Sequence, residues 1–283
     1  MTEGWDGNTY LRVGLIGCGS IGTIIAKAID EGKIEDVELV VVYDIVREHA
    51  ERLISKLLKK PVISANADEL INRDDIQLVI EAASQEAVRQ YALKVLQKDK
   101  DFMVMSTGAL LDDGFFDQVL TLAKKKGRKV YIPSGAIVGL DNVKSAAMGE
   151  VYEVVLKTRK PPLSFEGASL IKDKNIDLNA IKEPLLLFRG TAREAVKLFP
   201  SNINVAASLS LAGVGADKTQ VEIIADPEMK NIIHEIYVRG EFGEFKTKTV
   251  NKRFPENPKT SFIAALSALA TLKKIASNVV VGT

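Results

Sequence analysis

The sequence predicts an α/β protein, in which a doubly wound parallel sheet is joined to a second α+β domain containing a mostly antiparallel sheet. Up to residue 133, apolar runs such as "VELVVVYD" and "IQLVIEAAS" alternate with amphipathic segments of helical length. This alternation is typical of βαβ units. From Ser134 onward, segments such as "IIHEIYVRG" and "EFKTKTVNKRF" alternate apolar with polar residues. That pattern indicates strands with one covered face.

The change of pattern gives the expected domain boundaries. The first domain is expected to span 1–133 plus 256–283, with "NPKTSFIAALSALATLKKIASN" forming a returning C-terminal helix, and the second to span 134–255. Within the second domain, "RGEFGEF" predicts a tight hairpin. Thr191 and Glu194 in "TAREAVKLFP" predict a helix with a capping box, and "NVAASLSLAG" a further helix. Residues 161–184 carry no distinctive motif.

Composition excludes several classes of protein. The formal net charge of +1 gives no bulk field for nucleic acid or anionic membranes. The apolar runs are too short to span a bilayer, and "MTEGWDGNTY" lacks the basic and apolar regions of a signal peptide. A single cysteine, Cys18, rules out an internal disulfide and suits a reducing cytoplasm. With only two histidines besides, no metal site is expected.

A glycine-rich segment predicts a dinucleotide site. "GLIGCGSIG" places Gly17, Gly19 and Gly22 between an expected strand and an expected helix, and Asp44 ends the following strand. This context is the fingerprint of a Rossmann-type domain. Gly17 would permit the tight turn, Gly19 would admit the pyrophosphate, and Gly22 would allow close helix packing. Asp44 would accept ribose hydroxyls, which favours NAD, while nearby Arg47 leaves NADP open. A helix N-cap is the alternative role for Asp44.

Three loops of small residues follow expected strands of the parallel sheet. They are Ala82–Ser84, Ser106–Gly108 and Ser134–Ala136. Ligands of such sheets lie beyond the carboxyl ends of the strands, so these loops are expected near the cofactor. Simple close packing of the strand ends is the alternative.

His234 is the candidate acid/base residue. Alternation places it on the same side of its strand as Ile236 and Val238, the side that a strand normally buries. A core histidine with satisfied hydrogen bonds fits this pattern, and so does a catalytic one, since histidine titrates near neutrality. The other histidine, His49, lies among charges in "VREHAER" and is expected to be solvated.

Several longer motifs resemble one family. "SGAIVGLD", "FPSNINVAASLSLAG", "HEIYVRGEFGE" and "NPKTSFIAALSAL" follow the glycine motif in an order that strongly resembles the L-aspartate dehydrogenases of archaea and bacteria. The resemblance implies oxidation of L-aspartate by NAD or NADP to iminoaspartate, which water converts to oxaloacetate and ammonia, feeding NAD biosynthesis. It also implies a cytoplasmic homodimer, paired through the sheet of the second domain.

The resemblance also assigns site residues. It makes His234 the active-site residue and gives Ala136 and Asn204 to NAD binding, although helix capping is an alternative for Asn204. Together with the glycine motif and the loops, the expected cofactor-binding set is Gly17, Gly19, Ser20, Ile21, Gly22, Asp44, Ser84, Ala136 and Asn204.

The two carboxylates of an aspartate substrate require cationic or hydrogen-bonding partners. Arginine can bind a carboxylate through two parallel hydrogen bonds. The candidates are Arg159, Lys160 and Asn202, together with Lys259 and Thr260 at the expected start of the final helix. For each charged candidate, a solvated surface position is the alternative.

Two other functions share these features. One is a different small-substrate dehydrogenase of the same architecture, similar to homoserine dehydrogenase or to the sugar dehydrogenases, although the E-K-P motif of the sugar enzymes is absent. The other is a non-catalytic dinucleotide sensor, which would bind NADH without turnover. Assays with L-aspartate, homoserine and myo-inositol separate these possibilities.

Overall fold

A computed structural model describes residues 10–200, 203–254 and 257–283, with the backbone alone for Phe254 and 257–260. By its internal contacts the chain divides into two compact units. Unit 1 comprises Met1–Pro133 and Ala268–Val281, and unit 2 comprises Ser134–Ser267 and the last two residues. The C-terminal segment thus joins unit 1 from Ala268, against an expected start at residue 256.

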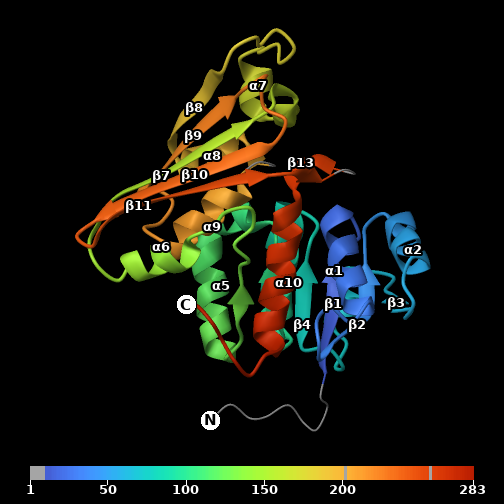
Figure 1. Ribbon diagram of the computed structural model, residues 1–283. Coiled ribbons are helices and arrows are strands. Elements are labelled where there is room, and N and C mark those ends of the chain that lie inside the picture. The colour runs from blue at the N-terminus through green and yellow to red at the C-terminus, as the bar shows by residue number, and fades with distance from the viewer. Residues whose placement is uncertain (1–9, 201–202, 255–256) are drawn as a thin grey trace. The chain divides into compact units, whose positions relative to one another are not determined.

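Unit 1 is built on a six-stranded sheet in the order β3-β2-β1-β4-β5-β6, in which every neighbouring pair is parallel (Figure 1). The order reverses at β1, which lies between β2 and β4, so the sheet is doubly wound as expected. The strands are β1 (Leu11–Ile16), β2 (Val37–Tyr43), β3 (Val62–Ile63), β4 (Leu78–Glu81), β5 (Asp101–Val104) and β6 (Val130–Tyr131). The helices are α1 (Ser20–Asp30), α2 (Arg47–Ser55), α3 (Ala67–Ile71), α4 (Gln85–Gln97), η1 (Thr107–Leu111) and α5 (Asp113–Lys126).

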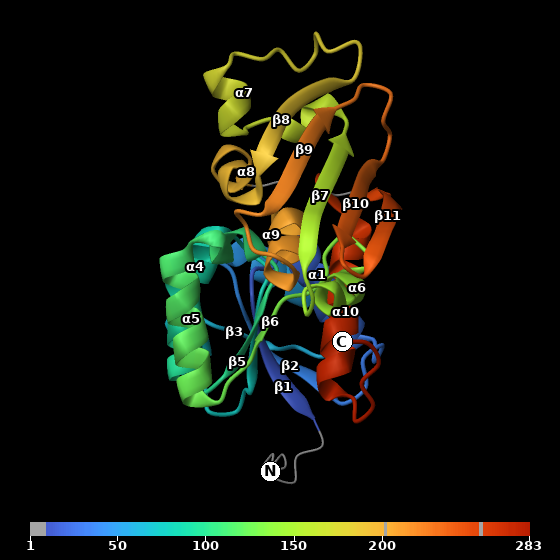
Figure 2. The same cartoon turned by 90° about the vertical axis from the view of Figure 1, so that its left-hand side faces the viewer.

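Helices cover both faces of this sheet, as Figure 2 shows for α4 and α5 on one side and α10 (Phe262–Ala276) on the other. One core combines Leu15 and Val42 of the strands with Ile25 of α1 and with Ala268 and Leu272 of α10. Because both faces are buried, the strands are continuously apolar rather than alternating. That burial explains the uninterrupted runs in the sequence.

Unit 2 contains a five-stranded sheet in the order β11-β10-β7-β9-β8. Three of its pairings are antiparallel, and β7–β9 is parallel. The strands are β7 (Val151–Lys160), β8 (Leu185–Thr191), β9 (Thr219–Ala225), β10 (Ile232–Gly240) and β11 (Gly243–Asn251), with a separate pair β12 (Arg253–Phe254) and β13 (Asn257–Ser261). The helices are α6 (Leu140–Ala146), η2 (Pro162–Phe165), α7 (Ser169–Asp173), α8 (Ala192–Leu198) and α9 (Asn204–Ala212).

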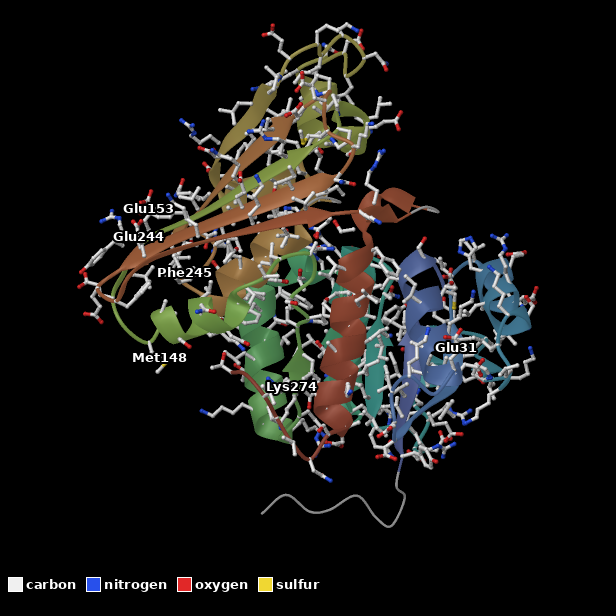
Figure 3. The ribbon with its side chains drawn as sticks, viewed as in Figure 1. Glu31, Met148, Glu153, Glu244, Phe245 and Lys274 are labelled. Atoms are coloured by element: carbon white, nitrogen blue, oxygen red, sulfur yellow. The ribbon has the colours of Figure 1, made fainter. Side chains whose placement is uncertain are left out.

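The two faces of this second sheet differ in chemistry. On the buried face, Val154, Leu156, Ile236 and Val238 are nearly inaccessible to solvent. The opposite face carries ion pairs across the strands, such as Lys157 with Glu222 and Lys248 with Glu235. The two-residue turn after Gly240 confirms the hairpin, and Gly243 at φ 107° supplies the conformation that closes it. Figure 3 shows Glu153, Glu244 and Phe245 at this end of the sheet.

Several element boundaries differ from the expectations. The strand expected over "RKVYIPSGAIVG" stops at Tyr131, since Pro133 has no N–H for a sheet ladder. The final helix begins at Phe262, so the backbone of Lys259 and Thr260 lies in β13 and not in a helix. Pro258 disfavours a helical conformation at the residue before it, and pairing with β12 uses the extended backbone instead. The capping box of α8 is confirmed, with Thr191 and Glu194 each accepting the other's backbone N–H.

Candidate active site

The loop between β1 and α1 has the geometry of a phosphate cradle. Gly17 has φ of 100°, and a Cβ there would lie 2.5 Å from the Ala82 carbonyl oxygen. A Cβ on Gly22 would collide with the Gly17 carbonyl, so both positions require glycine. At exposed Gly19, by contrast, an added Cβ meets nothing within 4 Å among the described residues. The chain is therefore open at Gly19, where α1 begins, and the N–H groups and dipole of a helix N-terminus suit a pyrophosphate.

Asp44 is fixed beside this cradle. One carboxylate oxygen accepts the Cys18 N–H at 2.7 Å and the other accepts the Val46 N–H at 2.9 Å. The N-cap of α2 is Val46, so capping does not explain Asp44. His49 is exposed, with Nδ1 3.4 Å from the same carboxylate. Each carboxylate oxygen has a further lone pair available to a ribose hydroxyl.

A buried carboxylate that the sequence analysis missed joins two of the loops. Glu81 ends β4 and is fully buried. It accepts the Ala83 N–H at 2.7 Å, the Met105 N–H at 3.2 Å, and both the N–H and the hydroxyl of Ser106, at 3.0 and 2.8 Å. Burial raises the pKa of Glu81, and these four donors oppose the rise. An acidic residue inside the apolar run "LVIEAAS" was the available signal.

The 106–108 loop is consequently packed rather than open. Ser106, Thr107 and Gly108 are all buried, and the last two belong to the 3₁₀ helix η1. For this loop the close-packing alternative agrees with the structure. The loop after β4 differs, since Ala83 and Ser84 are exposed.

His234 lies near one end of the buried face of the second sheet. Its register partners are Thr158 on β7 and Thr249 on β11. The Thr158 hydroxyl is 3.0 Å from Nδ1 of the imidazole, and only 3% of His234 is exposed. Burial, followed by the positive charge of Lys160, lowers the pKa of His234 to about 3. The ring is therefore neutral at physiological pH.

Lys160 is the second titratable group on this face. It follows Thr158 by two residues on β7, so both side chains point to the buried side, and 5% of Lys160 is exposed. Burial lowers its pKa to about 8. Arg159 points to the other side, where its guanidinium donates to Asp226 at 2.9 Å. The structure thus brings Lys160 to the face of His234 and directs Arg159 away.

The loop that holds Ala136 is anchored by two buried residues of β11. Asn251 donates to the Ala136 carbonyl at 2.9 Å, and the Thr249 hydroxyl donates to it at 3.1 Å. Asn251 also donates to Thr249, and Ser267 accepts the Gly135 N–H at 3.0 Å. Because Thr249 pairs with His234, one short network links the loop to the histidine strand. Thr249 and Asn251 were not predicted as site residues from the sequence, although both fall on the buried side of an alternating strand.

Models of two known protein families match this chain. The model of the aspartate dehydrogenase C-terminal domain matches residues 141–275, and that of the homoserine dehydrogenase NAD-binding domain matches 17–133. An L-aspartate dehydrogenase from Methanococcoides burtonii is 51% identical over 96% of this chain and 100% of its own length. The chain belongs to the L-aspartate dehydrogenase family.

Other relatives of the L-aspartate dehydrogenase family agree. The enzyme from Methanothermobacter thermautotrophicus is 45% identical over 96% of this chain and 99% of its own length. The crystal structure of aspartate dehydrogenase from Thermotoga maritima has a TM-score of 0.73 and 30% identity, covering 96% of this chain and 100% of that one. A myo-inositol dehydrogenase from Lactobacillus casei shares the fold alone, with a TM-score of 0.57 at 14% identity over 96% of this chain and 89% of that one. The expected α/β fold, the family and the NAD or NADP cofactor are therefore confirmed.

The structure also places the remaining residues that were expected at the site. Ser84 is the N-cap of α4, and its hydroxyl accepts the Ala87 N–H at 3.1 Å. Asn204 is the first residue of α9, whose N-cap is Ile203, so the capping alternative for Asn204 is wrong. Ser20 and Ile21 form the first turn of α1. Asn202 lies outside the described residues, as do the side chains of Lys259 and Thr260.

Cys18 is buried between the glycines. Burial and then the charge of Asp44 raise the pKa of its thiol to about 12, so it is a small packing residue and not a thiolate nucleophile.

In the described part of the chain, no helix is long and apolar enough to cross a membrane.

Proposed function

We propose that this protein oxidises L-aspartate with NAD or NADP, giving iminoaspartate that water converts to oxaloacetate and ammonia. The observation that carries the proposal is the pairing of a neutral, buried histidine with a buried ammonium on one face of unit 2. A base and a carboxylate-binding cation are the two groups that an amino dicarboxylate requires. The names of the relatives support this choice of substrate.

His234 is proposed to move the protons of the reaction. Loss of hydride from the α-carbon requires a neutral amine, so a base must first remove a proton from the substrate ammonium. The later attack of water on the imine also releases a proton. Imidazole can perform both transfers. The nicotinamide cofactor, when bound, accepts the hydride.

Lys160 is proposed to hold a substrate carboxylate and, in doing so, to activate His234. The pKa of His234 is low partly because the Lys160 charge is nearby. A carboxylate bound to Lys160 offsets that charge and raises the pKa of His234 towards the range of an effective base. In this scheme the imidazole becomes basic only once the dicarboxylate has bound.

The other substrate-binding candidates have different standing. Arg159 stays a prediction, but its ion pair with buried Asp226 must be weakened before it can bind a substrate. Asn202, Lys259 and Thr260 also stay predictions. Comparing KM for L-aspartate between Arg159→Met and Lys160→Met decides which cation matters.

We propose that NAD is preferred over NADP. The Asp44 carboxylate beside the glycine cradle would repel a 2′-phosphate. Arg47, a cation that could offset this repulsion, donates to Glu51 at 2.9 Å. Gly17, Gly19, Ser20, Ile21 and Gly22 would receive the pyrophosphate, with Ser84, Ala136 and Asn204 as further contacts. The ratio of kcat/KM values for the two cofactors measures the preference.

The physiological setting is proposed on the family resemblance. The enzyme would supply NAD biosynthesis in the cytoplasm. It would act as a homodimer paired through the face of the unit 2 sheet that lies opposite the buried face. On that face Val155 and Tyr237 are partly buried beside the Lys157–Glu222 and Lys248–Glu235 ion pairs. Light scattering during size-exclusion chromatography measures the molar mass of the protein in solution. A molar mass equal to that of one chain would refute the proposed dimer.

The test of the proposed function is a spectrophotometric assay of NAD⁺ and NADP⁺ reduction. L-Aspartate should support turnover, and L-homoserine and myo-inositol should not. His234→Ala should fold normally, bind NADH and lose turnover by about 10²- to 10⁴-fold, the usual contribution of a positioned acid/base group. NADH binding without turnover of any of the three substrates would instead identify a sensor.

A further inference from the structure

The Thr158 side chain is in hydrogen-bonding contact with the imidazole of His234. Thr158 and His234 face each other as register partners on β7 and β10. The hydroxyl oxygen is 3.0 Å from Nδ1, and both residues are buried, with exposed fractions of 5% and 3%.

Its place in the sheet makes the hydroxyl a rigid partner. The antiparallel ladder between β7 and β10 sets the separation of the two backbones. Threonine is branched at Cβ and is therefore restricted about χ1. The hydroxyl thus fixes the rotation of the imidazole, and proton exchange with a substrate falls to Nε2.

A hydroxyl group also suits a histidine that changes protonation state. It can accept a hydrogen bond from Nδ1–H or donate one to a bare Nδ1. A base that accepts protons at Nε2 must carry its own proton on Nδ1, and Thr158 then accepts from it. After Nε2 is protonated, the Nδ1–H bond to Thr158 is unchanged. A carboxylate in this position would instead favour the imidazolium form in the resting enzyme.

We propose that Thr158 is the positioning residue of the acid/base histidine: its hydroxyl accepts Nδ1–H of His234, which selects the tautomer with a free Nε2 lone pair and aims that nitrogen at the substrate. This inference rests on the proposed role of His234. The proton taken from the substrate ammonium goes to Nε2 and later leaves from it. Thr158 neither gains nor loses a proton.

Both strands that pair with β10 place residues beside His234. Lys160 is the titratable group on the same face of β7, and Thr249 faces His234 from β11. On β10 itself the flanking residues of the buried face are Ile232 and Ile236. Lys160 remains unchanged in the variants below, so its effect on the pH profile is common to all of them.

The first experiment compares Thr158→Val with Thr158→Ser. Valine keeps the shape and removes the hydroxyl, and serine keeps the hydroxyl. For Thr158→Val we expect kcat with L-aspartate to fall by about 10- to 100-fold. This loss is smaller than the full contribution of an acid/base group, because the imidazole itself remains. KM for the cofactor should stay the same, and the pH at which kcat is half-maximal should shift. Thr158→Ser should restore kcat to within about threefold of the wild type.

The second experiment reads the tautomer directly in the wild-type protein. The chain has two histidines, so ¹⁵N-histidine labelling gives two sets of ring signals, and His234→Asn identifies the set of His234. The expected spectrum shows a protonated Nδ1 and a bare Nε2. A proton on Nε2 in the wild type overturns the inference, as does a Thr158→Val enzyme with wild-type kcat and pH profile.

Failure of the proposed function has a different signature. If the wild type does not turn over L-aspartate, or if His234→Ala retains its activity, the proposed function is wrong whatever the tautomer. If both controls behave as expected while Thr158→Val equals Thr158→Ser, only the role of Thr158 is wrong.

Discussion

Replacing the buried ammonium of Lys160 should stabilise the protein while impairing its activity. Burial lowers the pKa of Lys160 from 10.5 to about 8. The unfolded chain therefore binds this proton more tightly than the folded chain, so below pH 8 the charge favours unfolding. The two pKa values correspond to about 3 kcal/mol at pH 7.5, at about 1.4 kcal/mol for each pH unit. Lys160→Met should recover most of this, since methionine fills a similar volume without charge.

The effect of Lys160 on stability depends on pH in a definite direction. Because the folded pKa lies below the unfolded one, the destabilisation is complete below pH 8 and disappears as pH rises above 10.5. The advantage of Lys160→Met should therefore shrink from about 3 kcal/mol at pH 7.5 to less than about 1 kcal/mol at pH 10.

Urea unfolding followed by far-UV circular dichroism measures this effect. With an m-value of about 2 kcal/mol/M, the midpoint at pH 7.5 should rise by about 1.5 M. Lys157→Met is the matched control, because Lys157 lies on the opposite face of β7 in a partly exposed ion pair with Glu222. Its stability should fall by at most about 1 kcal/mol. KM for L-aspartate should rise about 10- to 100-fold in Lys160→Met, the value of a hydrogen bond to a charged group.

A Lys160→Met protein that is no more stable than Lys157→Met would refute the reasoning. Partners of the Lys160 ammonium would then compensate its burial fully. A stabilised variant with unchanged KM would leave the electrostatics intact and refute the proposed contact with the substrate.

Four further substitutions have definite expected outcomes. His234→Asn should resist acid better than the wild type: the folded pKa of about 3 lies below the ordinary 6.5, so the wild type loses stability as pH falls below 6.5, by about 3 kcal/mol at pH 4.5. Parallel denaturant midpoints of the two proteins between pH 7.5 and 4.5 would contradict this. Glu81→Gln should lower the free energy of unfolding, measured in urea, by about 2–4 kcal/mol. An amide cannot accept all four hydrogen bonds that the carboxylate accepts. Gly17→Ala should lower both the melting temperature and the affinity for NADH, given its φ of 100° and its closeness to Ala82. Gly19→Ala adds a methyl group that meets no atom of the described residues within 4 Å. This variant should weaken NADH binding in a fluorescence titration with little change in melting temperature.

Local patterns were sufficient where the backbone itself carries the signal. The G-x-G-x-x-G motif, the run ending at Asp44 and the "RGEFGEF" hairpin depend on neighbouring residues, so the sequence predicted them correctly. The short elements β3 and α3, and the seven-residue strand β8, were not anticipated. Strands of two residues and helices of five carry too few residues to show a period. The strand β8 lies beside β9, a pairing between segments distant in the chain.

The residues that contact His234 and Glu81 could not be predicted from the sequence, because most of them lie on segments that are distant in the chain. Alternation could place His234 and Lys160 on buried faces of their own strands, but only strand pairing decides which face meets which. The register of β7 with β10 put Thr158 on the imidazole, and that of β11 with β10 put Thr249 beside it. Glu81 was invisible as a tether because its donors lie two residues and more than twenty residues away.

By itself the sequence determined the fold class, the glycine cradle and the rank of His234 as the candidate acid/base, because periodicity, turn chemistry and motif order are local properties. The tertiary structure alone decided that Lys160 shares the buried face of His234 and that Arg159 turns away to Asp226. It also decided the charge states, since a pKa depends on burial and on charges brought near by folding, and neither quantity is a property of the residue or its neighbours in sequence.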